Sequence, residues 1–134
     1  MNLRETSKLL YQLKIVNQEM TAMFEEKTGF SITRYELMQI LKENAPCSQS
    51  LIQTELKIDS AAVTRHLKIL EEKHYVTRER NQENNREIIV NLTKNALEDL
   101  TSCENQHNEE KKLNVSLTEK EEKTLLELLT KLAK

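Results

Sequence analysis

The chain has 134 residues, of which 37% are hydrophobic and 31% charged, and it contains one glycine, one proline and no tryptophan. So few turn residues exclude an all-β fold and a glycine-rich phosphate loop, and they predict a mainly helical protein with the size of one domain. The formal net charge of -2 excludes a protein that coats nucleic acid indiscriminately, although a sequence-specific binder needs only a local basic surface.

The first predicted helix covers residues 3–28 and is long for so small a protein. Its apolar residues recur at alternating steps of four and three, as on one face of an amphipathic helix: Leu9, Leu13, Val16, Met20 and Met23. Gly29 should end the helix, because the residue after a helix often needs a positive φ. A helix of this length exceeds what a small core can cover.

A second helix and a short third helix should follow. Thr33 and Glu36 form a capping box, in which a hydroxyl and a carboxylate each satisfy a free backbone N–H, so the second helix is predicted to begin there. Pro46 should end this helix, because proline disfavours helical geometry at the residue before it. Ser48 is a suitable N-cap for the third helix, whose apolar side chains are Leu51, Ile52 and Leu56.

A fourth helix and a hairpin are predicted next. Asp59 or Ser60 can cap the helix, whose buried side chains should be Val63, Leu67 and Leu70. Beyond it, residues 75–80 and 87–92 are the only β-prone segments, and the polar residues 81–86 join them. The sequence therefore predicts one hairpin, within a segment that has a modest excess of basic over acidic residues.

Two more helices complete the predicted fold. The fifth should begin near Thr93, and a second capping box, Thr118 with Glu121, should open the last. The leucines of the last helix form a face too broad for one neighbour: Leu125, Leu126, Leu128, Leu129 and Leu132. No apolar run approaches the roughly 18–20 residues of a membrane span, and the first residues form no signal-peptide pattern, so we expect a cytoplasmic protein without a membrane partner.

The order of these elements points to a function. Two helices joined by a short turn and followed by a hairpin form a winged helix-turn-helix, whose second helix lies in the major groove of DNA with its N-terminal residues at base edges. An arginine on the wing can enter the minor groove, where the negative potential favours cations. The predicted DNA contacts are Ser60, Ala61, Thr64, Arg65, His66, Lys68, Asn85 and Arg86. Among them, the direction of His66 depends on where the helix begins.

Several motifs together resemble the MarR (multiple antibiotic resistance regulator) family, over nearly the whole chain. Residues 60–78, SAAVTRHLKILEEKHYVTR, resemble the family's recognition helix and first wing strand. Residues 84–93, NNREIIVNLT, resemble its returning wing strand, and residues 117–121, LTEKE, resemble the start of its last dimerisation helix.

The resemblance implies one MarR-like domain, residues 1–134, that regulates transcription as a homodimer on a pseudo-palindromic operator in double-stranded DNA. Residues 1–30 and 94–134 would supply the dimerisation helices, and residues 31–93 the winged helix-turn-helix lobe. The family further implies a repressor, released by a small phenolic or lipophilic effector that binds in a cleft between the dimerisation and DNA lobes.

Two positions depart from the family's pattern. Asn84 stands where the wing of the family usually carries aspartate; its amide can still accept a hydrogen bond, but without the charge. His74 stands in the place of the usual glycine before the first wing strand. Arg86, the arginine of the same wing motif, is retained.

Other interpretations of single residues remain open at this point. Cys47 precedes a predicted helix, whose dipole can lower a thiol pKa. Cys47 is therefore either a redox switch or an unreactive turn residue. Met20, Met23 and Phe24 fit either core packing or the lining of an effector pocket. No catalytic arrangement or metal-ligand spacing is recognisable, so we expect no enzyme, cofactor or metal site. A helical protein-interaction module, such as an anti-activator that keeps the fold without binding DNA, is the remaining alternative.

Overall fold

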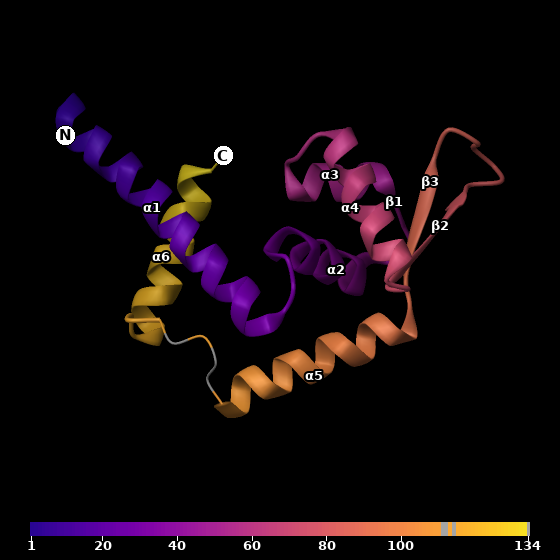
Figure 1. Ribbon diagram of the computed structural model, residues 1–134. Helices are drawn as coiled ribbons and strands as arrows, with labels where there is room; N and C mark the ends of the chain where they lie inside the picture. Colours follow the sequence, from indigo (N-terminus) through magenta and orange to yellow (C-terminus); the bar gives the residue numbers. More distant parts are fainter. Residues whose placement is uncertain (111–112, 114, 134) are drawn as a thin grey trace.

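The computed structural model describes residues 1–110, 113 and 115–133. In this part of the chain the helices are α1 Leu3–Thr28, α2 Ile32–Asn44, α3 Gln49–Leu56, α4 Ser60–Glu72, α5 Lys94–Glu110 and α6 Glu119–Leu132, and the strands are β1 Cys47–Ser48, β2 Val76–Arg80 and β3 Ile88–Leu92. Figure 1 shows α1 and α6 on one side of the molecule and α2, α3, α4 and the sheet on the other, with α5 running beneath both. The predicted fold class, mainly helical with a small β wing, is confirmed.

The sheet has one strand more than the sequence indicated. Strands β2 and β3 form the predicted antiparallel hairpin, with Val76 opposite Leu92 and Arg80 opposite Ile88. The short β1 pairs with the other edge of β3, through Cys47 opposite Val90, so the order is β1-β3-β2. The prediction of a hairpin alone was incomplete, because a strand of two residues has no alternation that a sequence can display.

The start of α2 also differs from the prediction. Ser31, rather than Thr33, is the N-cap, and its hydroxyl accepts a hydrogen bond from the backbone N–H of Arg34 at 3.4 Å. Both residues have the hydroxyl that a cap needs, but Ser31 is the one with an extended backbone, which a cap requires. The helix therefore begins two residues earlier, at Ile32.

The remaining helix ends follow the predicted chemistry. Gly29 has φ 76° and ends α1 in the left-handed conformation that glycine adopts without strain. Ser48 caps α3, and Asp59 caps α4 by accepting from the backbone N–H of Ala62 at 2.7 Å. The capping box that opens α6 from Thr118 is present.

The hydrophobic core lies entirely in the lobe that contains the sheet. Its buried members are Leu37, Met38, Ile40, Leu41, Cys47, Ile52, Val63, Leu67, Leu70, Val76, Val90, Ala96 and Leu100. The last two belong to α5, so the first turns of α5 pack on this lobe. Every residue of α1 and α6 is described, and none of them is buried. Leu126 and Leu128, for example, are 66% and 59% exposed.

Candidate nucleic-acid interface

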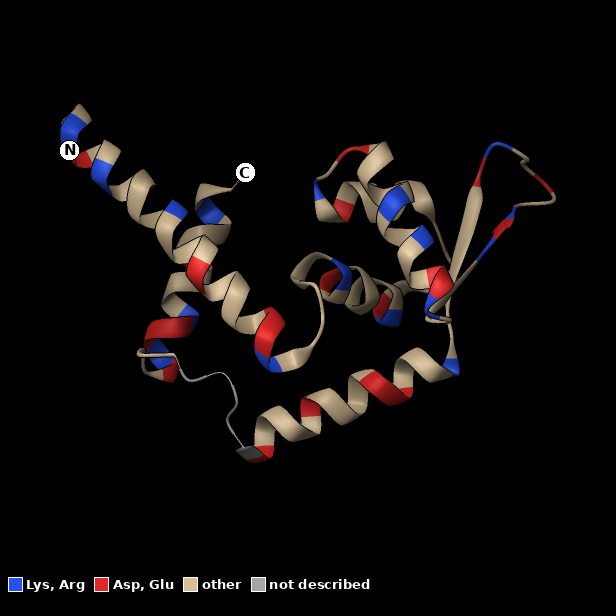
Figure 2. Ribbon diagram, in the orientation of Figure 1, with Lys and Arg blue, Asp and Glu red and all other residues tan. Residues whose placement is uncertain are grey.

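Helix α4 has a buried face and an exposed face, as its sequence predicts. Val63, Leu67 and Leu70 face the core, with at most 2% of their surface exposed. The opposite face is open to solvent and consists of Ser60, Ala61, Thr64, Arg65 and Lys68. Because Asp59 is the cap, Ser60 and Ala61 lie in the first turn, where a recognition helix meets base edges. Figure 2 shows basic residues on this helix and along the wing.

Three of the predicted contact residues are cations without a partner in the part of the chain that the structure describes. Among the described residues, none forms an ion pair or a side-chain hydrogen bond with Arg65, Lys68 or Arg86. All three side chains are exposed, two on α4 and one on the turn of the wing. The net charge of the chain is negative, but these positive charges are not neutralised locally. They are therefore free to meet phosphates or base acceptors.

Hydrogen bonds within the wing hold its turn in shape. The side-chain oxygen of Asn84 accepts from the backbone N–H of Arg86 at 3.2 Å, so the prediction that asparagine can replace the usual aspartate as an acceptor is confirmed. On the other side of the turn, Nη1 of Arg80 donates to the backbone carbonyl of Asn85 at 2.8 Å. Asn85 and Arg86 thus lie on a turn that two hydrogen bonds stabilise. The hydrogen bond from Arg80 was not apparent from the sequence.

An ion pair joins the end of α4 to the first wing strand. Nη2 of Arg78 lies 3.1 Å from Oε1 of Glu71, and Nε of Arg78 lies 3.5 Å from Oε2. The hydrogen bonds from Arg78 hold the pKa of Glu71 below its usual value. This pair fixes the direction of the recognition helix relative to the wing. Sequence reasoning missed it, because a spacing of seven residues across a turn has no recognisable signature.

His66 contacts protein more than it faces solvent. Its Nδ1 lies 3.3 Å from Nη1 of Arg34 on α2, and the side chain is half-buried. Burial first, and then the charges of Arg34 and Arg65, lower the pKa of His66. The neutral ring can accept from Arg34, so His66 braces α4 against α2. A DNA contact by His66 stays a prediction.

The junction between the lobe and α5 contains a positive-φ residue and a strong hydrogen bond. His74 has φ 62°, which explains why glycine is usual at this place. The hydroxyl of Tyr75 donates to Oδ2 of Asp99 at 2.5 Å, and this bond, with burial, raises the pKa of Tyr75 to about 12. The ring of Tyr75 also packs on Phe30, with 6.3 Å between ring centroids. The base of the wing is therefore tied to α5.

The structure contradicts the expectation of a lowered thiol pKa at Cys47. The side chain lies in the core, 8% exposed, and burial raises its pKa. A raised pKa disfavours the thiolate, which is the reactive form, so the lowered pKa on which the redox interpretation of Cys47 depended is absent. Cys103, on α5, is half-buried. In the described ranges, no group of three or more acidic, histidine or cysteine side chains could hold a metal, and no helix could cross a membrane.

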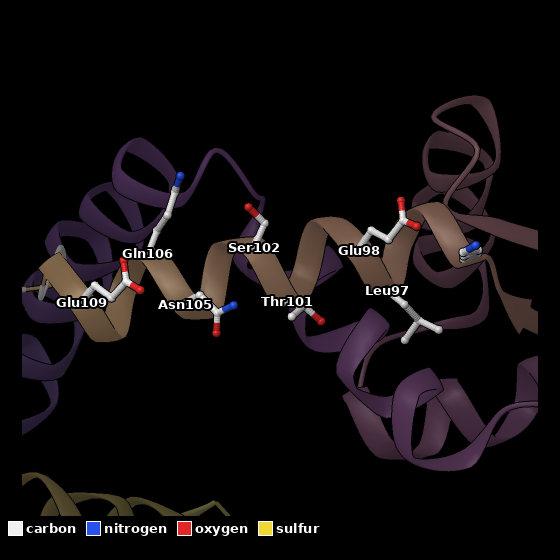
Figure 3. A pocket seen from close by; sticks show the side chains of 8 residues that line it. Leu97, Glu98, Thr101, Ser102, Asn105, Gln106 and Glu109 are labelled. Carbon is white, nitrogen blue, oxygen red and sulfur yellow. The ribbon is translucent and has the colours of Figure 1, made fainter.

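Hollows are also present outside the DNA-facing surface. A groove of about 550 Å³ runs along α5, and because every lining residue comes from that one helix, it is a helix face rather than a cleft between elements (Figure 3). A second hollow, of about 370 Å³, is mostly apolar and lies between α1, α6 and the segment before α6. Met20, Met23 and Phe24 line the second hollow, so they are not part of the core.

Comparison with known proteins gives consistent results. A model of the MarR family matches residues 30–88. The chain is 38% identical over 129 residues to a Bacillus subtilis (strain 168) protein named uncharacterized HTH-type transcriptional regulator YdgJ, and the match covers 96% of this chain and 79% of that protein.

Solved structures show the same fold. A mutant MarR from E. coli, complexed with operator DNA, is 24% identical with a TM-score of 0.82, and the match covers 98% of this chain and 99% of that chain. Reduced AbfR bound to DNA is 25% identical, also with a TM-score of 0.82, and the match covers 98% of this chain and 93% of that chain. AbfR comes from Staphylococcus epidermidis.

Proposed function

Because the chain belongs to the MarR family, we propose that it is a sequence-specific DNA-binding regulator of transcription that acts as a homodimer. The observation that carries this proposal is the set of unpaired cations, Arg65, Lys68 and Arg86, on the two elements that a winged helix-turn-helix applies to DNA. Both elements are exposed at these residues, so the three charges are accessible to phosphates and base edges.

In the proposed complex, α4 lies in the major groove and the wing lies over the adjacent minor groove. Arg65 has the planar fork that pairs with guanine O6 and N7, and Lys68 has a charge suited to a phosphate. The methyl group of Ala61 can contact a thymine methyl group. Arg86 would enter the minor groove, where negative potential attracts cations. Ser60, Thr64, His66 and Asn85 complete the proposed contacts.

Residues 31–93 would form the DNA lobe, and residues 1–30 and 94–134 the dimerisation helices. The exposed apolar side chains support this division, because α1 and α6 bury none of their residues within one chain. Leu128 and Leu132, 59% and 61% exposed, do not line the hollow against α1 and are available to a second copy. A two-fold dimer would place two recognition helices about 34 Å apart, one turn of DNA, on a pseudo-palindromic operator.

We further propose that the protein is a repressor that a small lipophilic or phenolic effector releases from DNA. The hollow between α1 and α6 supports this proposal, since about 370 Å³ is enough for a small ligand and the lining is mostly apolar. It lies among the proposed dimerisation helices and reaches the DNA lobe only at Ile32, so its place differs from the cleft between the lobes that the family implies. Met20 and Met23 have flexible side chains that adapt to ligands of varied shape. No part of the proposal includes an enzymatic step.

The test is a fluorescence-anisotropy titration of the purified protein against its own upstream DNA, in the presence of unrelated competitor DNA. Arg65→Ala and Arg86→Ala should each weaken specific binding about tenfold or more, because a base contact of this kind contributes about 1–3 kcal/mol. Arg4→Ala, at the exposed start of α1, is the matched control and should bind like the parent. If the folded dimer binds no DNA above competitor, a protein-interaction module becomes the better interpretation.

A further inference from the structure

Gln49, at the start of α3, touches the DNA-facing surface of α4. Its amide nitrogen, Nε2, donates to the hydroxyl oxygen of Thr64 at 2.9 Å. The Thr64 hydroxyl also lies 3.0 Å from the backbone carbonyl of Ser60. Gln49 is half-buried, whereas Thr64 is exposed on the face of α4 that would meet base edges. The Gln49 amide therefore contacts Thr64 from the protein side, opposite to the side that would face DNA.

These two contacts fix what the Thr64 hydroxyl can do. A hydroxyl has one proton and two lone pairs. The Ser60 carbonyl can only accept, so the proton must point toward it, and the Gln49 N–H occupies one lone pair. A single lone pair remains for DNA. In this state Thr64 can accept a hydrogen bond from a base but cannot donate one.

The carbonyl oxygen of the Gln49 amide indicates that this side chain does not increase the stability of the fold. Its carbonyl oxygen, Oε1, is buried and receives no hydrogen bond from any residue that the structure describes. Turning the amide around would not help, because Oε1 would then compete with the Ser60 carbonyl for the one proton of Thr64. A buried acceptor without a donor is unfavourable, so an apolar side chain of equal size would serve the fold as well.

We propose that Gln49 is a specificity-determining residue that acts through Thr64, by restricting Thr64 to accepting from a base. This inference rests on the proposed function. In the major groove the amino groups of adenine and cytosine donate, whereas guanine O6 and N7 and thymine O4 only accept. Each half-site should therefore carry adenine or cytosine at the base that faces Thr64. The bond from Gln49 holds the Thr64 side chain in the rotamer that places its proton on the Ser60 carbonyl. Without Gln49 the side chain can turn to another rotamer, leave the Ser60 carbonyl and donate, so guanine and thymine become acceptable there.

The experiment is selection of bound sequences from a randomised duplex library by the full-length protein. The variants are Gln49→Met, which keeps the size but removes both polar atoms, and Gln49→Ala, should the first fold poorly. Gln53→Met, one turn further along α3, is the matched control. Thr64→Val and the double variant Gln49→Met with Thr64→Val show whether Gln49 acts through the hydroxyl.

The parent should select adenine or cytosine at one position of each half-site, and Gln49→Met should lose that preference while the other positions keep theirs. Thr64→Val should lose it too, and the double variant should equal Thr64→Val. The melting temperature of Gln49→Met should be at or above that of the parent. The exposed Thr64 hydroxyl can bond to water in place of Gln49, and Oε1, a buried acceptor with no donor among the described residues, is removed. An unchanged base profile in Gln49→Met, or a further change in the double variant, overturns the inference alone. If the parent selects no motif, the proposed function fails with it.

Discussion

Replacement of Tyr75 by phenylalanine tests how the wing is joined to α5. The change removes one hydroxyl and leaves the ring, so packing on Phe30 is kept and only the hydrogen bond to Asp99 is lost. A hydrogen bond to a charged group contributes about 1.5–3 kcal/mol to stability. The rise in the pKa of Tyr75 from 10.0 to about 12 gives an upper bound of about 2.7 kcal/mol. Both side chains are only half-buried, which places the expected loss near the lower value, about 1.5 kcal/mol.

The pKa of Tyr75 also gives this prediction a pH dependence. Since the folded value is raised above the unfolded value of 10.0, the stabilisation is complete below pH 10.0 and is lost as the pH rises through about 12. The difference in unfolding free energy between the parent and Tyr75→Phe should therefore be constant from neutral pH to about pH 9 and should shrink at about pH 11.

Urea unfolding at one protein concentration measures this difference, because the stability of a dimer depends on concentration. Tyr11→Phe is the control, since Tyr11 is 61% exposed and its hydroxyl lies far from the junction in sequence. The change at Tyr11 should leave the unfolding midpoint unchanged at neutral pH. If Tyr75→Phe costs the same when Asp99 is already replaced by alanine, which has no acceptor, the hydrogen bond does not carry the stability and the reasoning is refuted.

Three further outcomes are expected. His74→Gly should stabilise the protein by about 1 kcal/mol, because φ 62° strains a residue with a Cβ; an unchanged or lower urea midpoint would contradict this. The folded pKa of His66 is lowered by burial and by the neighbouring guanidinium groups, so the stability it contributes should be complete above the usual histidine pKa of 6.5 and lost as the pH falls through the folded value. Urea midpoints measured from neutral to mildly acidic pH should therefore fall in the parent more than in His66→Gln, and parallel curves would exclude the effect. Leu128→Glu should raise the dimer dissociation constant by about 100-fold or more. Burial of one leucine side chain contributes about 1.5–3 kcal/mol of binding free energy, and the dimer would lose this contribution from both copies. Sedimentation across a concentration series checks this last outcome, and an unchanged dimer would place Leu128 outside the interface.

The sequence predicted those features whose causes are local. Gly29, Ser48 and Thr118 end or begin helices through bonds to residues within four positions, and such bonds have a fixed spacing in sequence. The buried and exposed faces of α4 follow from its period in the same way. The cap of α2 was misplaced because Ser31 and Thr33 offer the same chemistry two residues apart, and only the backbone conformation distinguishes them.

The contacts that shape the DNA-facing surface could not be predicted, because they join elements that pack only in three dimensions. Gln49 meets Thr64 across 15 positions, and Arg34 meets His66 across 32. Strand β1 exists only by its pairing with β3. The sequence therefore indicated which side chains face outward, whereas the side chains that hold them in place became apparent only from the packing of α2 and α3 on α4.

The position of the core bears on how an effector could act. Ala96 and Leu100 are buried in the sheet-containing lobe, so the first turns of α5 must move with that lobe. The Tyr75–Asp99 bond reinforces this connection, and Nζ of Lys57, beside the start of α4, donates to the carbonyl of Ala133 after α6 at 2.9 Å. An effector between α1 and α6 would contact Ile32 at the start of α2, so it can reach the recognition helix through α2, whose Arg34 meets His66, and through the end of α6. It would change DNA affinity only if it bound one arrangement of these helices more tightly than the other. A ligand that filled the hollow equally well in both would leave the operator occupied, however tightly it bound.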